Sequence, residues 1–244
     1  DQVVFSGVGK TRREMELALS AGVRCFNVES NSELDVLSAV DRQMGKTAAI
    51  SLRVNPDVDA QTHPYISTGL KGNKFGVDHS GALALYRRAA QLPGIHVTGI
   101  ACHIGSQITA VAPYLDALER LLDLTETVEA EGITLPHLDL GGGLGIVYTD
   151  EHPPAADALV AELLQRIDAR GHGHREIVLA PGRSLVGNAG VLLTEVLVTK
   201  HGTPKNFCIV DAAMNDLLRP ALYQATMAIV PCIQRAGAGT LYDV

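Results

Sequence analysis

Two clusters of glycine and small polar residues have the composition of a ligand-binding site. Residues 139–145 read Asp-Leu-Gly-Gly-Gly-Leu-Gly and directly follow an apolar run. Glycines at such a point let backbone N–H groups converge on an anion, usually a phosphate, although a flexible turn has the same composition. Residues 103–107 read His-Ile-Gly-Ser-Gln and also follow an apolar run. This setting favours a binding site over a histidine that only makes a structural hydrogen bond.

Two arginines have the chemistry to bind carboxylates. Arg183 follows Pro181 and Gly182, whose sharp turn projects the guanidinium from a constrained backbone. A guanidinium suits bidentate carboxylate recognition, although a single arginine of this kind is more often a solvated surface residue. Arg219 and Tyr223 are four residues apart, so a local helix would place them on one face.

Several other functions have no support in the sequence. The net charge of -7 argues against a nucleic-acid partner or an anionic membrane surface. No apolar run approaches the roughly 20 residues of a membrane span. The four cysteines are far apart, which indicates reduced cytoplasmic thiols and not a disulfide framework. The nine histidines form no recognisable metal-binding pattern, and dinucleotide, Walker and nucleophile-elbow motifs are absent.

The sequence predicts alternating strands and helices, and these elements would position the clusters. Buried strands separated by helices indicate a parallel sheet covered by helices, and about six units fit a (β/α)₈ TIM-type barrel with roughly two units fewer. Function in such a barrel lies at the carboxyl ends of the strands, where both glycine clusters and Arg183 occur. The expected strands are 3–6, 25–29, 48–54, 97–103, 135–140 and 176–180, and the expected helices are 11–20, 32–43, 80–91, 113–130 and 154–169.

The pattern changes after the sixth unit. Segments 190–200 and 206–211 look like strands joined by a short turn, with no helix between them. We therefore expect a partial barrel in residues 1–186 and the beginning of a β-rich domain in 187–244. Both ends run directly through element-like sequence, so we expect this chain to be an internal piece of a longer protein.

The clusters, in this order, resemble the fold-type III pyridoxal-phosphate-dependent decarboxylases, whose barrel is alanine racemase-like, and most closely the diaminopimelate decarboxylases. An ordered set of motifs is far more specific than any one of them. The Thr62–Gly69 loop and the last of the motifs favour diaminopimelate over ornithine or arginine. The resemblance runs through residues 4–11, 27–30, 53–56, 73–76, 103–107, 139–145, 181–184 and 215–223.

The resemblance implies a role for each site residue. His103 would stack on the pyridoxal phosphate ring, with Ser106 beside the ring or phosphate. The phosphate would lie against the backbone of Gly141, Gly142 and Gly143. Arg183, Arg219 and Tyr223 would hold substrate carboxylates or help to bind the phosphate.

The implied reaction is the decarboxylation of meso-2,6-diaminopimelate to L-lysine, the last step of lysine biosynthesis. The implied protein is a cytoplasmic homodimer that binds a small amino-acid substrate and no metal, nucleic acid or membrane.

Two departures from the family pattern matter. The Schiff-base lysine motif, Tyr-Ala-x-Lys-Ala-Asn, matches none of the six lysines, so we expect that lysine to lie outside this chain and the chain to be catalytically incomplete. The family motif Glu-Pro-Gly-Arg places a glutamate against the pyridine nitrogen, and Ala180 occupies that position here. Two other functions stay open. A related ornithine- or arginine-type decarboxylase stays open because the family's C-terminal specificity residues are not in this sequence, and a non-catalytic pyridoxal-phosphate-binding paralogue stays open because of Ala180.

Overall fold

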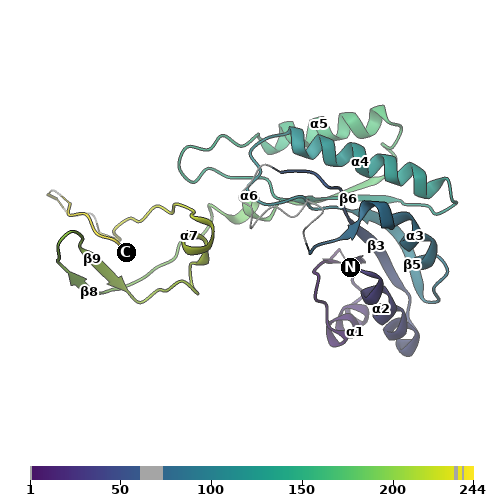
Figure 1. Ribbon diagram of the computed structural model, residues 1–244, viewed down its shortest axis with the longest axis horizontal. Coiled ribbons are helices and arrows are strands. Elements are labelled where there is room, and N and C mark those ends of the chain that lie inside the picture. Colours follow the sequence, from purple (N-terminus) through teal and green to yellow (C-terminus); the bar gives the residue numbers. More distant parts are fainter. Residues whose placement is uncertain (1, 61–73, 234–235, 238) are drawn as a thin grey trace.

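The computed structural model describes residues 2–60, 74–233, 236–237 and 239–244. Its main body is a parallel α/β half-barrel of six strands, as the sequence predicts (Figure 1). The strands are hydrogen-bonded in chain order, and a short additional strand, β4 (Val77–Asp78), pairs with β3. The six are β1 (Val4–Phe5), β2 (Cys25–Val28), β3 (Ala48–Asn55), β5 (Ile95–Ala101), β6 (His137–Gly142) and β7 (Glu176–Ala180).

Helices connect successive strands and form the layer outside the sheet. The first has the predicted capping box, in which the Thr11 side chain accepts from the Glu14 N–H and the Glu14 carboxylate accepts from the Thr11 N–H. It ends at Gly22, which adopts the left-handed conformation that glycine tolerates best. The five helices are α1 (Arg12–Ala21), α2 (Asn31–Met44), α3 (His79–Ala89), α4 (Ala112–Glu129) and α5 (Ala156–Ala169).

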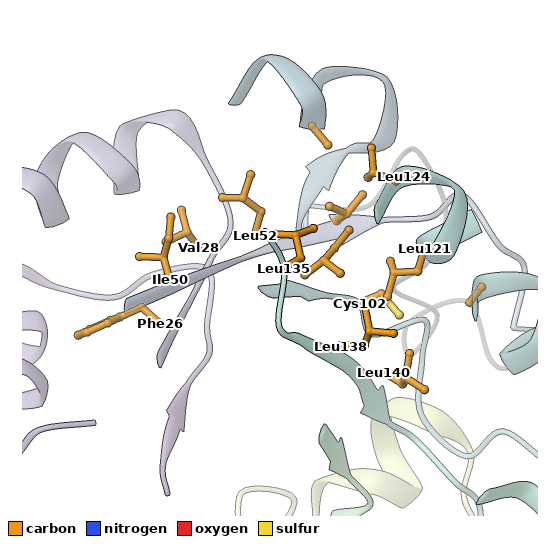
Figure 2. Packing of buried hydrophobic residues seen from close by; sticks show 14 of the residues in the cluster. Phe26, Val28, Ile50, Leu52, Cys102, Leu121, Leu124, Leu135, Leu138 and Leu140 are labelled. Atoms are coloured by element: carbon orange, nitrogen blue, oxygen red, sulfur yellow. The ribbon is translucent and has the colours of Figure 1, made fainter. Parts of the chain in front are cut away.

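One hydrophobic core fills the space between the strands and helices. Central strands β2 and β3 are buried on both faces, which is the pattern of a parallel sheet covered by other elements. Burying apolar surface stabilises the fold by about 25 cal/mol per Å², so this core anchors the strand ends. Figure 2 shows Phe26, Val28, Ile50 and Leu52 from these strands and Cys102, Leu121, Leu138 and Leu140 from the β5, α4 and β6 part of the core.

The chain after β7 has a different architecture. A short helix, α6 (Gly182–Val186), leads to an antiparallel pair, β8 (Val196–Lys200) and β9 (Phe207–Val210), and to α7 (Leu218–Tyr223). These last three elements lie to one side of the half-barrel in Figure 1. The predicted strand 190–200 is shorter than expected, and β4 and α6 were not predicted. No helix in the described residues is long and apolar enough to cross a membrane.

Candidate functional site

The carboxyl ends of β5, β6 and β7 bring three predicted clusters together. The Gly142 N–H donates to His103 Nδ1 at 3.2 Å, which joins the second cluster to the triple glycine. Arg183, at the start of α6, donates to Ser106 Oγ at 2.7 Å and to Gln107 Oε1 at 2.8 Å. Residues from three neighbouring strand ends therefore form one hydrogen-bonded group.

The triple glycine is required by close backbone approach. A Cβ on Gly141 would lie 2.4 Å from the Cys102 carbonyl oxygen, and one on Gly142 would lie 1.9 Å from that of Ala180. Gly141 and Gly143 also have positive φ angles of 68° and 92°. A Cβ on Gly143 would likewise lie 2.0 Å from the Gly105 carbonyl oxygen, so the loop takes this course only with glycine at all three positions.

Two N–H groups of the triple glycine already have acceptors within the chain. The Gly141 N–H donates to the Asp139 carboxylate at 2.9 Å, and the Gly142 N–H donates to His103. A phosphate that bound either of these two N–H groups would have to replace its acceptor, and the longer bond to His103 is the one more easily replaced. The role of Gly141, Gly142 and Gly143 in binding phosphate stays a prediction.

His103 is held in its neutral form. Burial, and then the positive charge of Arg53, lower the pKa of its imidazole to about 4, against the opposing effect of Glu29. Because Nδ1 accepts from Gly142, the ring proton is assigned to Nε2. A neutral, half-buried imidazole is suited to lie flat against an uncharged aromatic ring.

This pKa predicts how stability depends on pH. Unfolded His103 takes up a proton near pH 6.5, whereas folded His103 does so only near pH 4. The unfolded state therefore binds more protons in this window, and stability that is present above pH 6.5 is lost as the pH falls towards 4. The His103 contribution is about 3 kcal/mol at most. Urea unfolding between pH 7 and 4 should give a flatter profile for His103→Gln, and a variant profile parallel to the wild type would contradict this assignment.

Arg183 and Arg219 both lie against the ring of Tyr148. The Arg219 guanidinium lies 5.8 Å from the centre of the Tyr148 ring and 5.2 Å from that of Tyr223, which confirms that α7 places Arg219 and Tyr223 on one face. The Arg183 guanidinium lies 6.0 Å from the Tyr148 ring. Burial, and then the charge of Arg219, lower the pKa of Arg183. These two cations form no salt bridge within the described part of the chain.

A second charged group lies at the ends of β2 and β3. Glu29 is buried and pairs with Arg53 at 3.0 Å, and it also accepts from the Gly76 N–H at 3.0 Å. The Arg53 guanidinium lies 5.1 Å from the centre of the Phe75 ring. Both predicted motifs, 53–56 and the described part of 73–76, are thus joined at the sheet edge. The predicted substrate-selective loop 62–69 lies outside the described residues.

The donor set suits a phosphate-bearing aromatic cofactor. It combines a neutral imidazole, the Ser106 hydroxyl and the Arg183 guanidinium beside a glycine loop. Arg219 Nε is buried without a hydrogen-bond partner, which is consistent with an anion binding nearby. The position expected to face the ring nitrogen, Ala180, offers no carboxylate. Among the described residues, no group of three or more metal-ligating side chains gathers in one place.

Sequence reasoning missed Tyr148 and gave Gln107 no role of its own. Gln107 belongs to the second predicted cluster, but its bonds to Arg183 and to the backbone of Ile146 depend on the folded chain. Tyr148 lies five residues after Gly143. Its only signal in the sequence is that it is an aromatic residue close to the glycine loop.

The fold and site define a pyridoxal-phosphate-binding half-barrel, and comparison with known families agrees. Residues 1–187 match the pyridoxal binding domain of the pyridoxal-dependent decarboxylases. The chain belongs to this family.

Diaminopimelate decarboxylases are prominent among the relatives. The protein of that name from Vibrio cholerae is 54% identical over 243 residues, which is all of this chain and 58% of that protein. The one from Pseudomonas aeruginosa is 56% identical over the same shares of the two chains. This chain therefore spans somewhat more than half the length of these relatives.

Solved structures show the same fold. Diaminopimelate decarboxylase from Helicobacter pylori, complexed with L-lysine, is 41% identical with a TM-score of 0.83, over 92% of this chain and 56% of that chain. Lysine decarboxylase from Selenomonas ruminantium is 25% identical with a TM-score of 0.76, over 91% of this chain and 55% of that chain.

Proposed function

We propose that this chain supplies the cofactor and substrate contacts of a meso-diaminopimelate decarboxylase that forms L-lysine and CO₂. The observation that carries the proposal is the pair of guanidinium groups of Arg183 and Arg219, which lie against the same Tyr148 ring and have no salt bridge among the described residues. Two converging cations are suited to a substrate carboxylate. Diaminopimelate has a second carboxylate, remote from the one that leaves, for such a site to hold. The identity of 54–56% to diaminopimelate decarboxylases supports the same substrate.

Cofactor binding would use the glycine loop and its neighbours. The pyridoxal ring would lie against His103, and its phosphate would lie near Ser106 and the backbone of Gly141–Gly143. Arg183, Arg219 and Tyr223 would orient the substrate through its remote carboxylate. When bound, pyridoxal phosphate supplies an electron sink for the electron pair left behind by CO₂.

Lys10 is not available to form the covalent bond with pyridoxal phosphate. Its ammonium donates to the carbonyl oxygens of Gly7 and Asn27 and to the Glu33 carboxylate at 2.6–2.9 Å, so all three of its protons are engaged. We therefore propose that Lys10 is not the Schiff-base lysine. The absence of the family's lysine motif around all six lysines supports a Schiff-base lysine outside this chain. Borohydride reduction in the presence of pyridoxal phosphate, followed by peptide mapping, should leave Lys10 unlabelled.

The organisation of the complete protein is part of the proposal. We place the boundary between the barrel and the β-rich region at 186/187, which is supported by the end of the parallel sheet at β7. We also propose a homodimer and a cytoplasmic location for the complete protein, both of which are supported by the resemblance alone.

Two alternatives have specific support. A decarboxylase for another basic amino acid is favoured by the similarity to the Selenomonas ruminantium lysine decarboxylase, although the identity to it is only 25%. A non-catalytic pyridoxal-phosphate-binding protein is favoured by Ala180, which lacks the carboxylate of the family motif.

A substrate panel separates the three functions. We expect the complete protein, loaded with pyridoxal phosphate, to release CO₂ from meso-diaminopimelate and much less from lysine, ornithine or arginine. Arg219→Gln should lower kcat/KM for diaminopimelate about 10-fold, because a charge-assisted hydrogen bond to the remote carboxylate is lost. The matched control is Arg166→Gln, since Arg166 lies on α5 and pairs with Glu119 at the surface. Faster release from another substrate favours the first alternative, and no release from any favours the second.

A further inference from the structure

Tyr148 lies at the point where the two arginines meet. It is half-buried in the loop after β6, and its ring is within 6.0 Å of both guanidinium carbons. The backbone of this loop is fixed by Glu151, whose carboxylate accepts from the N–H groups of Tyr148 and Thr149 at 2.8 Å each. The Tyr148 ring is therefore a contact shared by two side chains that are 36 residues apart in the sequence.

Holding two guanidinium groups together has an electrostatic cost. Their like charges repel, and each is partly removed from water, which lowers the pKa of Arg183. Within the residues that the structure describes, no carboxylate pairs with either of them. The negative face of an aromatic ring is the compensation that is present, and such contacts stabilise a cation most when it is partly desolvated.

Each arginine is also held from a second direction. Arg183 donates to Ser106 and Gln107, and Arg219 lies against the Tyr223 ring. Tyr148 is the one described residue that has a ring contact with both guanidinium groups. Removing its ring would take away the contact that the two cations have in common and leave Arg183 with Ser106 and Gln107.

We propose that Tyr148 is a positioning residue that keeps Arg183 and Arg219 close enough to share one substrate carboxylate, and that it thereby determines specificity for carboxylate-bearing diamines. This inference rests on the proposed function for the identity of the substrate. Tyr148 itself has no role in the bond cleavage. Its contribution appears in how tightly the carboxylate end of the ligand is held.

L-lysine and cadaverine provide the test, because the two diamines differ by a single carboxylate. Calorimetry on the protein loaded with pyridoxal phosphate should show that Tyr148→Leu weakens L-lysine binding by roughly 5- to 30-fold, the range expected for loss of partly buried cation–π contacts. Cadaverine binding should change by less than about 2-fold. Tyr148→Phe is the matched control, since it keeps the ring and should retain L-lysine affinity.

If Tyr148 acts through the arginines, substitutions of Tyr148 and Arg219 should have non-additive effects on L-lysine affinity. In the Arg219→Gln background, Tyr148→Leu should have a smaller effect on L-lysine affinity than it has alone. If Tyr148→Leu does not fold, pentafluorophenylalanine at position 148 keeps the shape, reverses the charge distribution of the ring and should weaken L-lysine binding selectively. Equal losses for L-lysine and cadaverine, or no loss for either, would overturn the inference.

The inference and the proposed function fail in different ways. If the protein does not decarboxylate diaminopimelate but prefers L-lysine over cadaverine in a Tyr148-dependent manner, the proposed function is wrong and the inference stands. If decarboxylation is observed but Tyr148→Leu leaves that preference unchanged, the inference is wrong and the function stands.

Discussion

Gly143→Ala is expected to lower the free energy of unfolding by about 2 to 5 kcal/mol. Two effects combine at this position. Gly143 has a φ of 92°, which costs an L-residue about 1–2 kcal/mol. A Cβ there would also lie 2.0 Å from the Gly105 carbonyl oxygen, and overpacking of that kind costs about 1–3 kcal/mol because backbone has to move.

Gly22→Ala separates the two effects. Gly22 also has a positive φ, of 68°, but a Cβ there would meet nothing within 4 Å. This variant should therefore lose only the conformational part, about 1–2 kcal/mol. Urea unfolding of both variants would show whether the contact with Gly105 matters, and equal losses would mean that the loops around Gly143 can separate without cost.

Substitution of Gly143 should change the site as well as the stability. The approach of Gly143 to Gly105 holds the glycine loop against the cluster that contains His103 and Ser106. Moving these loops apart would disturb the Gly142–His103 hydrogen bond and the two bonds of Arg183 to that cluster. A flexible turn, the alternative interpretation of the triple glycine, would not produce both effects.

The half-barrel was predictable because its signals are local and repeated. Each buried strand is a short apolar run, and each helix has apolar residues at helical spacing. Thr11 and Glu14 form a capping box that is visible in the sequence. Short elements behave differently. The two residues of β4 and the five of α6 have too few local interactions to form alone, so contacts with β3 and with the loop ends decide their conformation.

The site was predictable in its members but not in its internal contacts. Strand ends on one edge of a parallel sheet must be neighbours, so the grouping of His103, the triple glycine and Arg183 follows from the strand order. The hydrogen bonds from Arg183 to residues 76 and 77 positions away depend on side-chain directions that no local pattern encodes. Tyr148 was missed for the same reason, since its importance comes from two distant arginines.

Ala180→Glu is expected to raise the rate of decarboxylation of the proposed enzyme by roughly 10- to 100-fold. The resemblance implies that the family has a glutamate at this position, whose carboxylate would form a charge-assisted hydrogen bond with the pyridine nitrogen of the cofactor, which is worth roughly 1.5–3 kcal/mol. The substitution needs no repacking, because Ala180 is exposed at the end of β7. Its backbone pairing with Gly142 does not depend on the side chain.

Ala180→Gln is the matched control, because glutamine has the shape of glutamate without its charge. Steady-state kinetics should show a rise in kcat for Ala180→Glu and little change for Ala180→Gln. Nitrogen NMR of labelled pyridoxal phosphate gives a second readout, since only the glutamate variant should keep the ring nitrogen protonated. Protonation without a gain in rate would mean that another step limits turnover. Neither protonation nor a gain would mean that position 180 does not face the ring nitrogen, and the alignment of this loop with the family motif would then be wrong.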